Sequence, residues 1–155
     1  MIIVISGTPG TGKTTIAKFL AKKYRLKYIE GDKFIQKNKL REDWDKRLRT
    51  WNVNTNKLNM ALIKLIKKEK NLVIDSHLGH YLPKKYVDIC IIVKCNPKVL
   101  RRRLTERKYH EEKIKHNTDS ELFDVCLNEA RERGHRIKVI DTTKVLKPKD
   151  IIKFL

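Results

Sequence analysis

The chain has 155 residues, a length typical of one domain, and 37 Lys and Arg residues against 18 Asp and Glu residues give it a formal net charge of +19. This charge indicates either a large acidic partner such as RNA or a solvated, lysine-rich surface of the kind that thermophile proteins carry. Cys90, Cys95 and Cys126 form no C-x-x-C pair and have no matching histidine spacing, which argues against a disulfide framework and against a zinc site.

An apolar, β-branched run at Ile2–Ile5 begins the chain and predicts a buried strand. Ser6-Gly7 interrupts this run, so the N-terminus has neither the basic lead of a secretory leader nor the length of a membrane span. We therefore expect a cytoplasmic protein with no membrane partner, and we take it to be a monomer.

The next segment, Gly7–Thr14, reads GTPGTGKT and completes the phosphate-binding loop pattern G-x-x-x-x-G-K-[ST]. Its glycines permit backbone torsions that let successive N–H groups point at phosphate oxygens. Lys13 would reach the β- and γ-phosphates, Thr14 would offer its hydroxyl to Mg²⁺, and the helix that begins near Lys13 would direct its positive end at the same anion. The loop predicts that the chain holds a nucleoside triphosphate; the alternative is a glycine-rich turn that binds nothing.

Apolar runs and helical spacing alternate along the rest of the chain, which predicts an α/β fold with a parallel sheet. The expected helices include one over about 13–23 and an amphipathic one around residues 58–66. Further strands are predicted at Leu72–Ile74, Val87–Val93 and Ile137–Ile140. Two polar, charged segments, about 33–56 and 106–116, resist assignment; such insertions beside a nucleotide site are often mobile covers.

Capping signals locate three later helices. Asn96-Pro97 predicts a helix start, followed by inward-facing Leu100 and Leu104. Thr118-Asp-Ser-Glu121 matches a capping box, which predicts that a helix follows it and stops at Gly134. The last helix is expected from about Pro148. The buried residues expected in these last two helices are Leu122, Phe123, Cys126, Ala130, Ile151, Ile152 and Leu155.

Asp75 ends the run Leu72–Ile74, where a carboxylate beside a phosphate loop would hold Mg²⁺ through water. We therefore predict a magnesium site made by Thr14 and Asp75. His77 follows two residues later, and two readings stay open for it: it places water or substrate, or it is a hydrogen-bonded loop histidine.

Phosphoryl transfer builds negative charge on the moving group, so a cationic clamp is expected opposite Lys13. Arg103 and Arg107 are four residues apart on one predicted helical face and are the candidates. Aromatic residues also interleave with basic ones in the two covers, as platforms for stacking bases would, although packing under a lid accounts for Trp51 equally well. These residues are Trp44, Trp51 and Tyr109.

Together, Gly7–Thr14, the turn Asp75-Ser76-His77 and the segment 103–114, which reads RLTERKYHEEKI, resemble the small adenylate kinases of the nuclear and archaeal type. Members of that family are also ATPases in maturation of the small ribosomal subunit. The similarity runs nearly end to end, through Asn117, residues 121–123 and residues 129–132. The phosphate loop is shared with many enzymes, whereas the Asp-x-His turn and the Arg-Leu…Tyr…Lys segment are far more particular.

The resemblance implies a P-loop NTPase fold of five parallel strands with helices on both faces, in a single domain over residues 1–155. It implies a monophosphate-binding segment at about 30–53 and a short lid at about 106–116. The ATP-binding residues that it implies are Gly10, Gly12, Lys13, Thr14, Thr15, Arg107 and Lys144. It places Asp75 and His77 in the second phosphate motif, with the histidine linked to ATP hydrolysis, and it implies a uS11-type ribosomal protein near the platform rRNA as a partner.

Two hypotheses follow. In the first, the protein is an adenylate kinase that moves the γ-phosphoryl group of Mg-ATP to AMP: Lys13 and Arg107 neutralise charge, Thr14 and Asp75 position Mg²⁺, and the covers exclude water. In the second, it is mainly an ATPase switch of ribosome assembly that releases a ribosomal protein or a pre-rRNA segment, which the net charge and the resemblance motivate. The two are compatible, because one site can transfer phosphate to AMP or to water.

Overall fold

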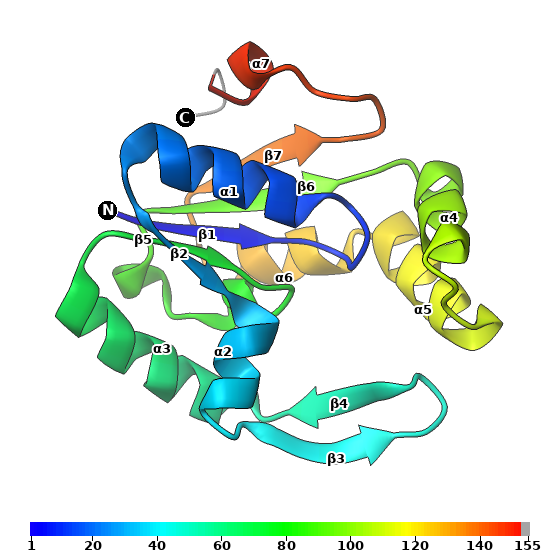
Figure 1. Cartoon of the computed structure of the whole chain (residues 1–155), viewed down its shortest axis with the longest axis horizontal. Coiled ribbons are helices and arrows are strands. Elements are labelled where there is room, and N and C mark those ends of the chain that lie inside the picture. The colour runs from blue at the N-terminus through cyan, green and yellow to red at the C-terminus, as the bar shows by residue number, and fades with distance from the viewer. Residues whose placement is uncertain (153–155) are drawn as a thin grey trace.

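The structure is a computed structural model that describes the backbone of residues 1–152 and the side chains of residues 1–147 and 150–152. At its centre lies a sheet of five strands in the order β2-β5-β1-β6-β7, and every pairing in it is parallel (Figure 1). These strands are β1 (Ile2–Ser6), β2 (Lys27–Glu30), β5 (Leu72–Asp75), β6 (Ile89–Lys94) and β7 (Ile137–Asp141). The predicted α/β fold class with a five-stranded parallel sheet is thus confirmed.

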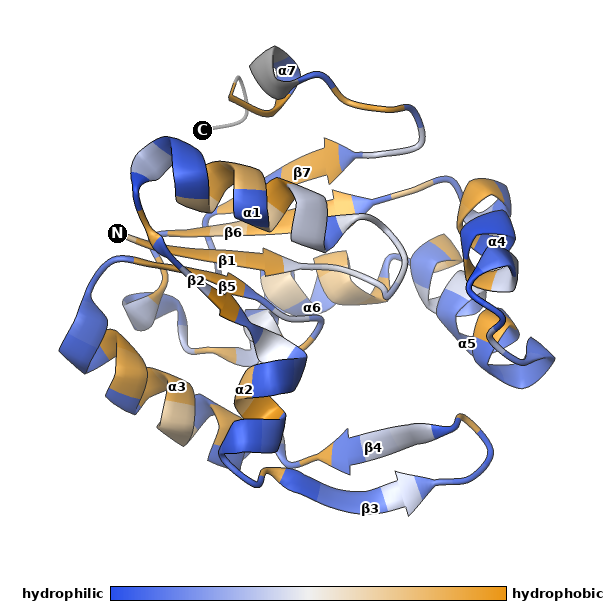
Figure 2. Cartoon of the chain, in the orientation of Figure 1, coloured by the Kyte–Doolittle hydropathy of each residue, from blue (hydrophilic) through white to orange (hydrophobic). Residues whose placement is uncertain are grey.

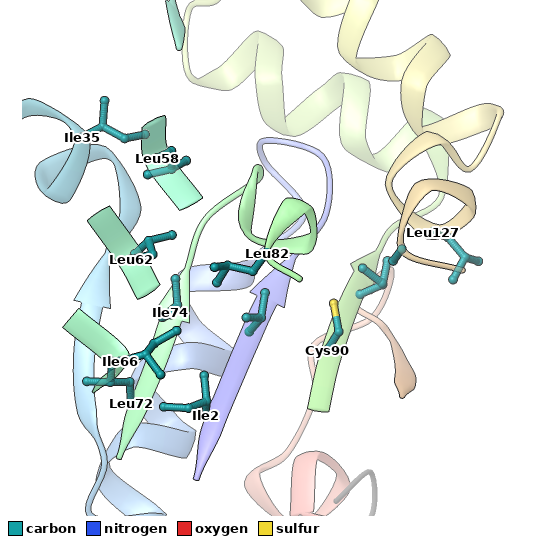
Figure 3. Packing of buried hydrophobic residues seen from close by; sticks show 13 residues of the cluster. Ile2, Ile35, Leu58, Leu62, Ile66, Leu72, Ile74, Leu82, Cys90 and Leu127 are labelled. Atoms are coloured by element: carbon teal, nitrogen blue, oxygen red, sulfur yellow. The ribbon is translucent and has the colours of Figure 1, made fainter. Parts of the chain in front are cut away.

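Helices cover both faces of this sheet. Ile3 and Ile5 of β1 pack with α1 (Lys13–Tyr24) and with Ile151 of α7 (Pro148–Ile152). The alternate residues Ile2 and Val4 face the other side, where α3 (Thr55–Glu69), the short turn η1 (Gly79–Tyr81) and α6 (Val125–Glu132) lie. Figure 3 shows this second layer, with Leu62 and Ile66 of α3 on the side of β5 and Leu127 of α6 on the side of β6. A strand covered on both faces has no polar side, which is why β1 reads as an unbroken apolar run.

The edge strand β2 escaped the sequence analysis. Its residues Lys27–Glu30 are exposed or half-buried, so the strand lacks the apolar run that marks its neighbours. Hydrogen bonding to β5 defines it instead, with Tyr28 opposite Val73.

The two segments that resisted assignment fold into elements beyond the carboxyl ends of the strands (Figure 1). The first forms α2 (Gly31–Lys37) and an antiparallel hairpin of β3 (Arg41–Asp45) and β4 (Thr50–Val53), separate from the central sheet. The second spans the end of α4 (Pro97–Glu106), a loop and the start of α5 (Glu111–Leu122). Figure 2 shows the hairpin and much of α4 and α5 as hydrophilic, in contrast to the apolar sheet.

Most of the predicted helices are present at close to the expected bounds, with Asn96 capping α4 and Leu100 and Leu104 buried. The capping-box prediction is wrong, because Thr118 and Glu121 lie inside α5. Thr118 Oγ1 donates a hydrogen bond to the carbonyl oxygen of Ile114 at 2.8 Å, one turn back in the same helix.

The helix predicted after residue 121 begins only at Val125, because Asp124 before it has a left-handed backbone with φ of 54°. Leu122 and Phe123 fall at this break and are 60% and 68% exposed instead of buried. Gly134 follows the end of α6 with positive φ, as expected of a stop residue.

At the C-terminal end, Ile151 is buried as predicted, Ile152 is exposed, and Leu155 lies outside the described residues. Among the described residues, no helix has both the length and the apolar character needed to cross a membrane.

Candidate active site

The loop between β1 and α1 follows a path that glycine makes possible. Gly10 and Gly12 have φ of 89° and 91°, in the left-handed region that side chains disfavour. A Cβ atom at Gly10 would lie 2.7 Å from Cδ2 of Leu104, so the loop also approaches α4 closely. The sequence pattern therefore has glycine at the two positions where the observed turn needs a positive φ.

Thr8 is the anchor of this loop. Its carbonyl oxygen accepts hydrogen bonds from Lys13 Nζ at 3.0 Å and from Thr11 Oγ1 at 2.8 Å. Its hydroxyl donates to Oε2 of Glu121 at 2.7 Å, while Oε1 of Glu121 accepts from the Cys95 backbone N–H at 2.9 Å. The buried Glu121 carboxylate thus ties the phosphate loop to the end of β6.

The predicted magnesium ligands lie together. Thr14 Oγ1 donates to Oδ2 of Asp75 at 2.6 Å, and the Tyr28 hydroxyl donates to the same oxygen at 2.9 Å. Burial, reinforced by the bond to Asp75, raises the pKa of Tyr28.

Hydroxyl and carboxylate oxygens suit Mg²⁺, which proteins hold through one or two side chains together with substrate phosphates and water. The described residues contain no group of three or more His, Cys, Asp or Glu residues able to hold a metal alone. The pair Thr14 and Asp75 therefore fits a metal that arrives with a nucleotide.

A cavity of about 530 Å³ opens in front of the loop. Eight of the nine residues predicted for the site line it: Gly10, Gly12, Lys13, Thr14, Thr15, Asp75, His77 and Arg107. The ninth, Lys144, lies exposed in the loop after β7 and is not among the lining residues.

Two of these groups have shifted pKa values. Burial lowers the pKa of Lys13, and the negative charge of Asp75 opposes this effect. Burial and then the positive charge of Lys13 lower the pKa of His77 to about 4. His77 is therefore a neutral imidazole at pH 7, able to donate or accept one hydrogen bond at the cavity wall.

A hydrogen-bond network behind His77 was missed in the sequence analysis. The His80 ring is 1% exposed, with Nδ1 2.7 Å from Ser6 Oγ and Nε2 2.8 Å from Oε2 of Glu129. The Tyr81 hydroxyl donates to Oε1 of Glu129 at 2.8 Å, and burial raises the pKa of Tyr81 to about 12. The network fixes one carboxylate, Glu129, in the cavity wall.

The structure separates the two clamp candidates. Arg107, at the end of α4, lines the cavity. Arg103 instead donates to the carbonyl oxygen of Thr142 at 2.6 Å, and Thr142 Oγ1 donates to the carbonyl oxygen of Thr11 at 2.5 Å. Arg103 therefore supports the phosphate loop from behind.

The two covers touch each other at the mouth of the cavity. His110 Nε2 donates to the carbonyl oxygen of Arg47 at 2.6 Å, and Lys113 Nζ donates to that of Arg49 at 3.2 Å. On the hairpin, Trp44 and Trp51 form an edge-to-face pair with ring centroids 5.3 Å apart. These two side chains are 45% and 42% exposed, so Trp51 is not packed beneath a lid. Of the three aromatic residues singled out in the covers, Tyr109 is the one that lines the cavity.

Comparisons with known proteins agree with this architecture. The sequence model of a family described as an AAA domain matches residues 3–124. The protein named "Putative adenylate kinase" of Methanocaldococcus jannaschii is 35% identical over 143 residues, which are 92% of this chain and 77% of that protein. The protein of the same name from Thermococcus kodakarensis is 38% identical over 143 residues, which are 92% of this chain and 77% of that protein. The one from Pyrococcus abyssi is 35% identical over 153 residues, which are 99% of this chain and 81% of that protein.

Solved structures with the same fold come from several kinases. A sugar kinase from Janibacter has a TM-score of 0.66 at 19% identity, over 98% of this chain and 90% of its own. Shikimate kinase from Aquifex aeolicus has a TM-score of 0.61 at 16% identity, over 99% and 92% of the two chains. Deoxyadenosine kinase from M. mycoides has a TM-score of 0.58 at 17% identity, over 99% and 96%. At these identities the similarity establishes the fold alone.

Proposed function

The chain belongs to the AAA domain family and to the family of the relatives named "Putative adenylate kinase", and from this premise we propose that it transfers the γ-phosphoryl group of Mg-ATP to AMP. The relatives support nucleotide kinase activity, and their name supplies the acceptor in this proposal. The observation that carries it is the convergence of Lys13, Thr14, Asp75 and Arg107 on one cavity, from the phosphate loop, a neighbouring strand and a cover.

In the proposed reaction, an oxygen of the AMP phosphate attacks the γ-phosphorus atom of ATP. The bond between that phosphorus and the oxygen bridging to the β-phosphate breaks, so ATP and AMP both become ADP. The attacking phosphate is already ionised, so no catalytic base is required. Thr14 and Asp75 would hold the Mg²⁺ that accompanies ATP, and the ion would supply positive charge to the phosphates.

Lys13 and Arg107 stabilise the charge that develops on the transferred group. Both act in a partly closed cavity, where the lower effective dielectric strengthens their attraction to phosphate oxygens. The lowered pKa of Lys13 results mainly from burial, and a bound triphosphate, as an added anion beside the ammonium, would raise it again. The bound nucleotide therefore favours the charged form of the lysine.

The direct test measures ADP formed from Mg-ATP with and without AMP. Strong AMP dependence, with two ADP formed for each AMP consumed, is the expected result. Absence of AMP-dependent turnover would rule out the kinase proposal. A Lys13→Ala variant of the same protein controls for contaminating kinases, because it removes the proposed phosphate ligand.

We propose ATP hydrolysis as a second activity, coupled to release of a uS11-type ribosomal protein or a pre-rRNA segment. The charge distribution favours this function: among the residues whose side chains are described, three Lys and Arg residues line the cavity, whereas the chain carries a net charge of +19. His77 is the proposed hydrolysis residue, so His77→Ala should reduce hydrolysis more than ATP affinity. A proportional loss in both would instead indicate that His77 only packs.

The ribosomal proposal is tested with the partner itself. Addition of the uS11-type protein should stimulate ADP formation in the absence of AMP, and ATP should weaken the complex. If binding is insensitive to ATP, the assembly function fails while the kinase proposal stands.

A further inference from the structure

The proposed acceptor is an anion, yet the cover that should receive it presents no cation to the cavity. Among the described residues, that cover contributes Glu30, Asp32, Leu48 and Thr50 to the lining. All seven basic residues of the same segment are absent from the lining and cannot neutralise the acceptor there: Lys33, Lys37, Lys39, Arg41, Lys46, Arg47 and Arg49. The charge that holds an acceptor phosphate must therefore come from another element.

Three lysine and arginine residues line the cavity within the described part of the chain: Lys13, Arg107 and Lys113. Lys13 belongs to the triphosphate loop, and Arg107 is the clamp proposed for the transferred group. Lys113, in the first turns of α5, is left without a role in the proposed reaction.

Lys113 lies at the hairpin end of the cavity. Its Nζ atom donates to the carbonyl oxygen of Arg49 at 3.2 Å, between the two hairpin residues of the lining, Leu48 and Thr50. The same Nζ atom lies 4.7 Å from the centre of the Tyr109 ring, which also lines the cavity. The ammonium group of this second-cover residue therefore reaches across the gap to the hairpin, 64 residues away along the chain.

The charge of Lys113 has no close counter-ion. No carboxylate of the described residues lies within 4.0 Å of its Nζ atom, in contrast to Lys115 two positions on, which pairs with Asp119 at 3.0 Å. Partial burial lowers the pKa of Lys113 and the charge of Asp32 opposes that shift. An ammonium has three donors, and one carbonyl oxygen satisfies only one of them, so two remain for a ligand.

We propose that Lys113 binds the phosphate of the acceptor nucleotide and so makes the site select a phosphorylated acceptor over its neutral nucleoside. The inference rests on the proposed kinase function and adds the residue that sets acceptor class. Proteins of the same fold are named for a sugar, shikimate or deoxyadenosine as acceptor, so the fold does not set this choice. A cation at the acceptor end does, because a phosphate dianion forms an ion pair with the ammonium through its hydrogen bonds, whereas a neutral hydroxyl group has no charge to pair with it.

The test compares Lys113→Met, which keeps the aliphatic stem and removes the charge, with the charge-retaining Lys113→Arg. Lys115→Met is the matched control, an exposed lysine of the same helix whose pair with Asp119 contributes little. AMP and adenosine are titrated into each protein by calorimetry, and KM is measured separately for AMP and for ATP. A thermal melt of each variant checks that it is folded.

Lys113→Met should weaken AMP binding and raise KM for AMP by about ten- to a hundredfold, the effect of losing a charged hydrogen bond. Adenosine affinity and KM for ATP should stay within about twofold, Lys113→Arg should recover most of the AMP affinity, and Lys115→Met should match the wild type.

The inference is overturned if Lys113→Met changes AMP and adenosine affinity alike, if it changes AMP affinity by less than about threefold, or if the wild type binds AMP no better than adenosine. Failure of the kinase proposal would give a different result from failure of this inference. If AMP binds through Lys113 but no ADP forms, the phosphate site stands and the kinase reaction does not.

Discussion

Replacement of Glu121 by alanine should damage both stability and nucleotide binding, because this carboxylate fastens the phosphate loop. Glu121 is 6% exposed, and it accepts one bond from the Thr8 hydroxyl at 2.7 Å and one from the Cys95 backbone N–H at 2.9 Å. Thr8 and Cys95 are themselves 2% and 3% exposed, so alanine would leave two buried donors without a partner. Each such donor costs about 1–3 kcal/mol, and we therefore expect a loss of about 4 kcal/mol in the free energy of unfolding.

The matched variant Glu121→Gln should be far milder. Its amide oxygen can accept from the Cys95 N–H and its amide nitrogen can donate to the Thr8 hydroxyl oxygen, so both contacts survive as neutral hydrogen bonds, at a cost of about 1 kcal/mol. Urea unfolding measures the stability of both variants, and calorimetry with a non-hydrolysable ATP analogue measures their affinity. Equal destabilisation by alanine and glutamine, or a loss below about 1 kcal/mol for alanine, would refute the anchoring role.

Three further outcomes are expected. Lys13→Ala should cost about three to six kcal/mol in transition-state stabilisation with the fold intact, measured as turnover; turnover within tenfold of wild type would exclude its proposed role. Gly10→Ala should destabilise by about 1–3 kcal/mol in urea unfolding, because φ is 89° and the added Cβ atom would meet Leu104; wild-type stability would contradict the close approach. For His77, the folded-state pKa of about 4 lies below the unfolded value of about 6.5. The unfolded chain therefore binds more protons between about pH 6.5 and 4. As the pH falls through that window, the free energy of unfolding should fall by at most about 3 kcal/mol. Urea unfolding at several pH values should show this slope, and His77→Asn should flatten it; an equal slope in the variant would assign the proton uptake to other groups.

The parts of the molecule that the sequence predicts well are those specified by neighbouring residues. The glycines and Lys13 of the phosphate loop, the strand before it and the helix after it follow from torsional freedom and apolar periodicity within a short window. Asp75 was predicted at the cavity because the carboxyl ends of parallel strands meet at one edge of the sheet.

Prediction from short stretches of sequence failed for strands that lack an apolar run and for a capping-box spacing that occurs inside a helix. The edge strand β2 carries no apolar run, and the hairpin residues Arg41–Asp45 are exposed and mostly charged, so neither resembles a strand in sequence. Glu121 has the spacing of a capping box with Thr118, but its carboxylate bonds to Thr8 and Cys95 instead of to a helix end.

The sequence by itself determined four of the five strands of the sheet, most helices and the phosphate-binding loop, because torsions, caps and apolar periodicity are specified by residues close together in the chain. Only the tertiary structure decided that Glu121 holds Thr8 across 113 residues and that Lys113 reaches Arg49 across 64. Such contacts depend on the order of the strands and on how the two covers meet, and these follow from the packing of the whole chain.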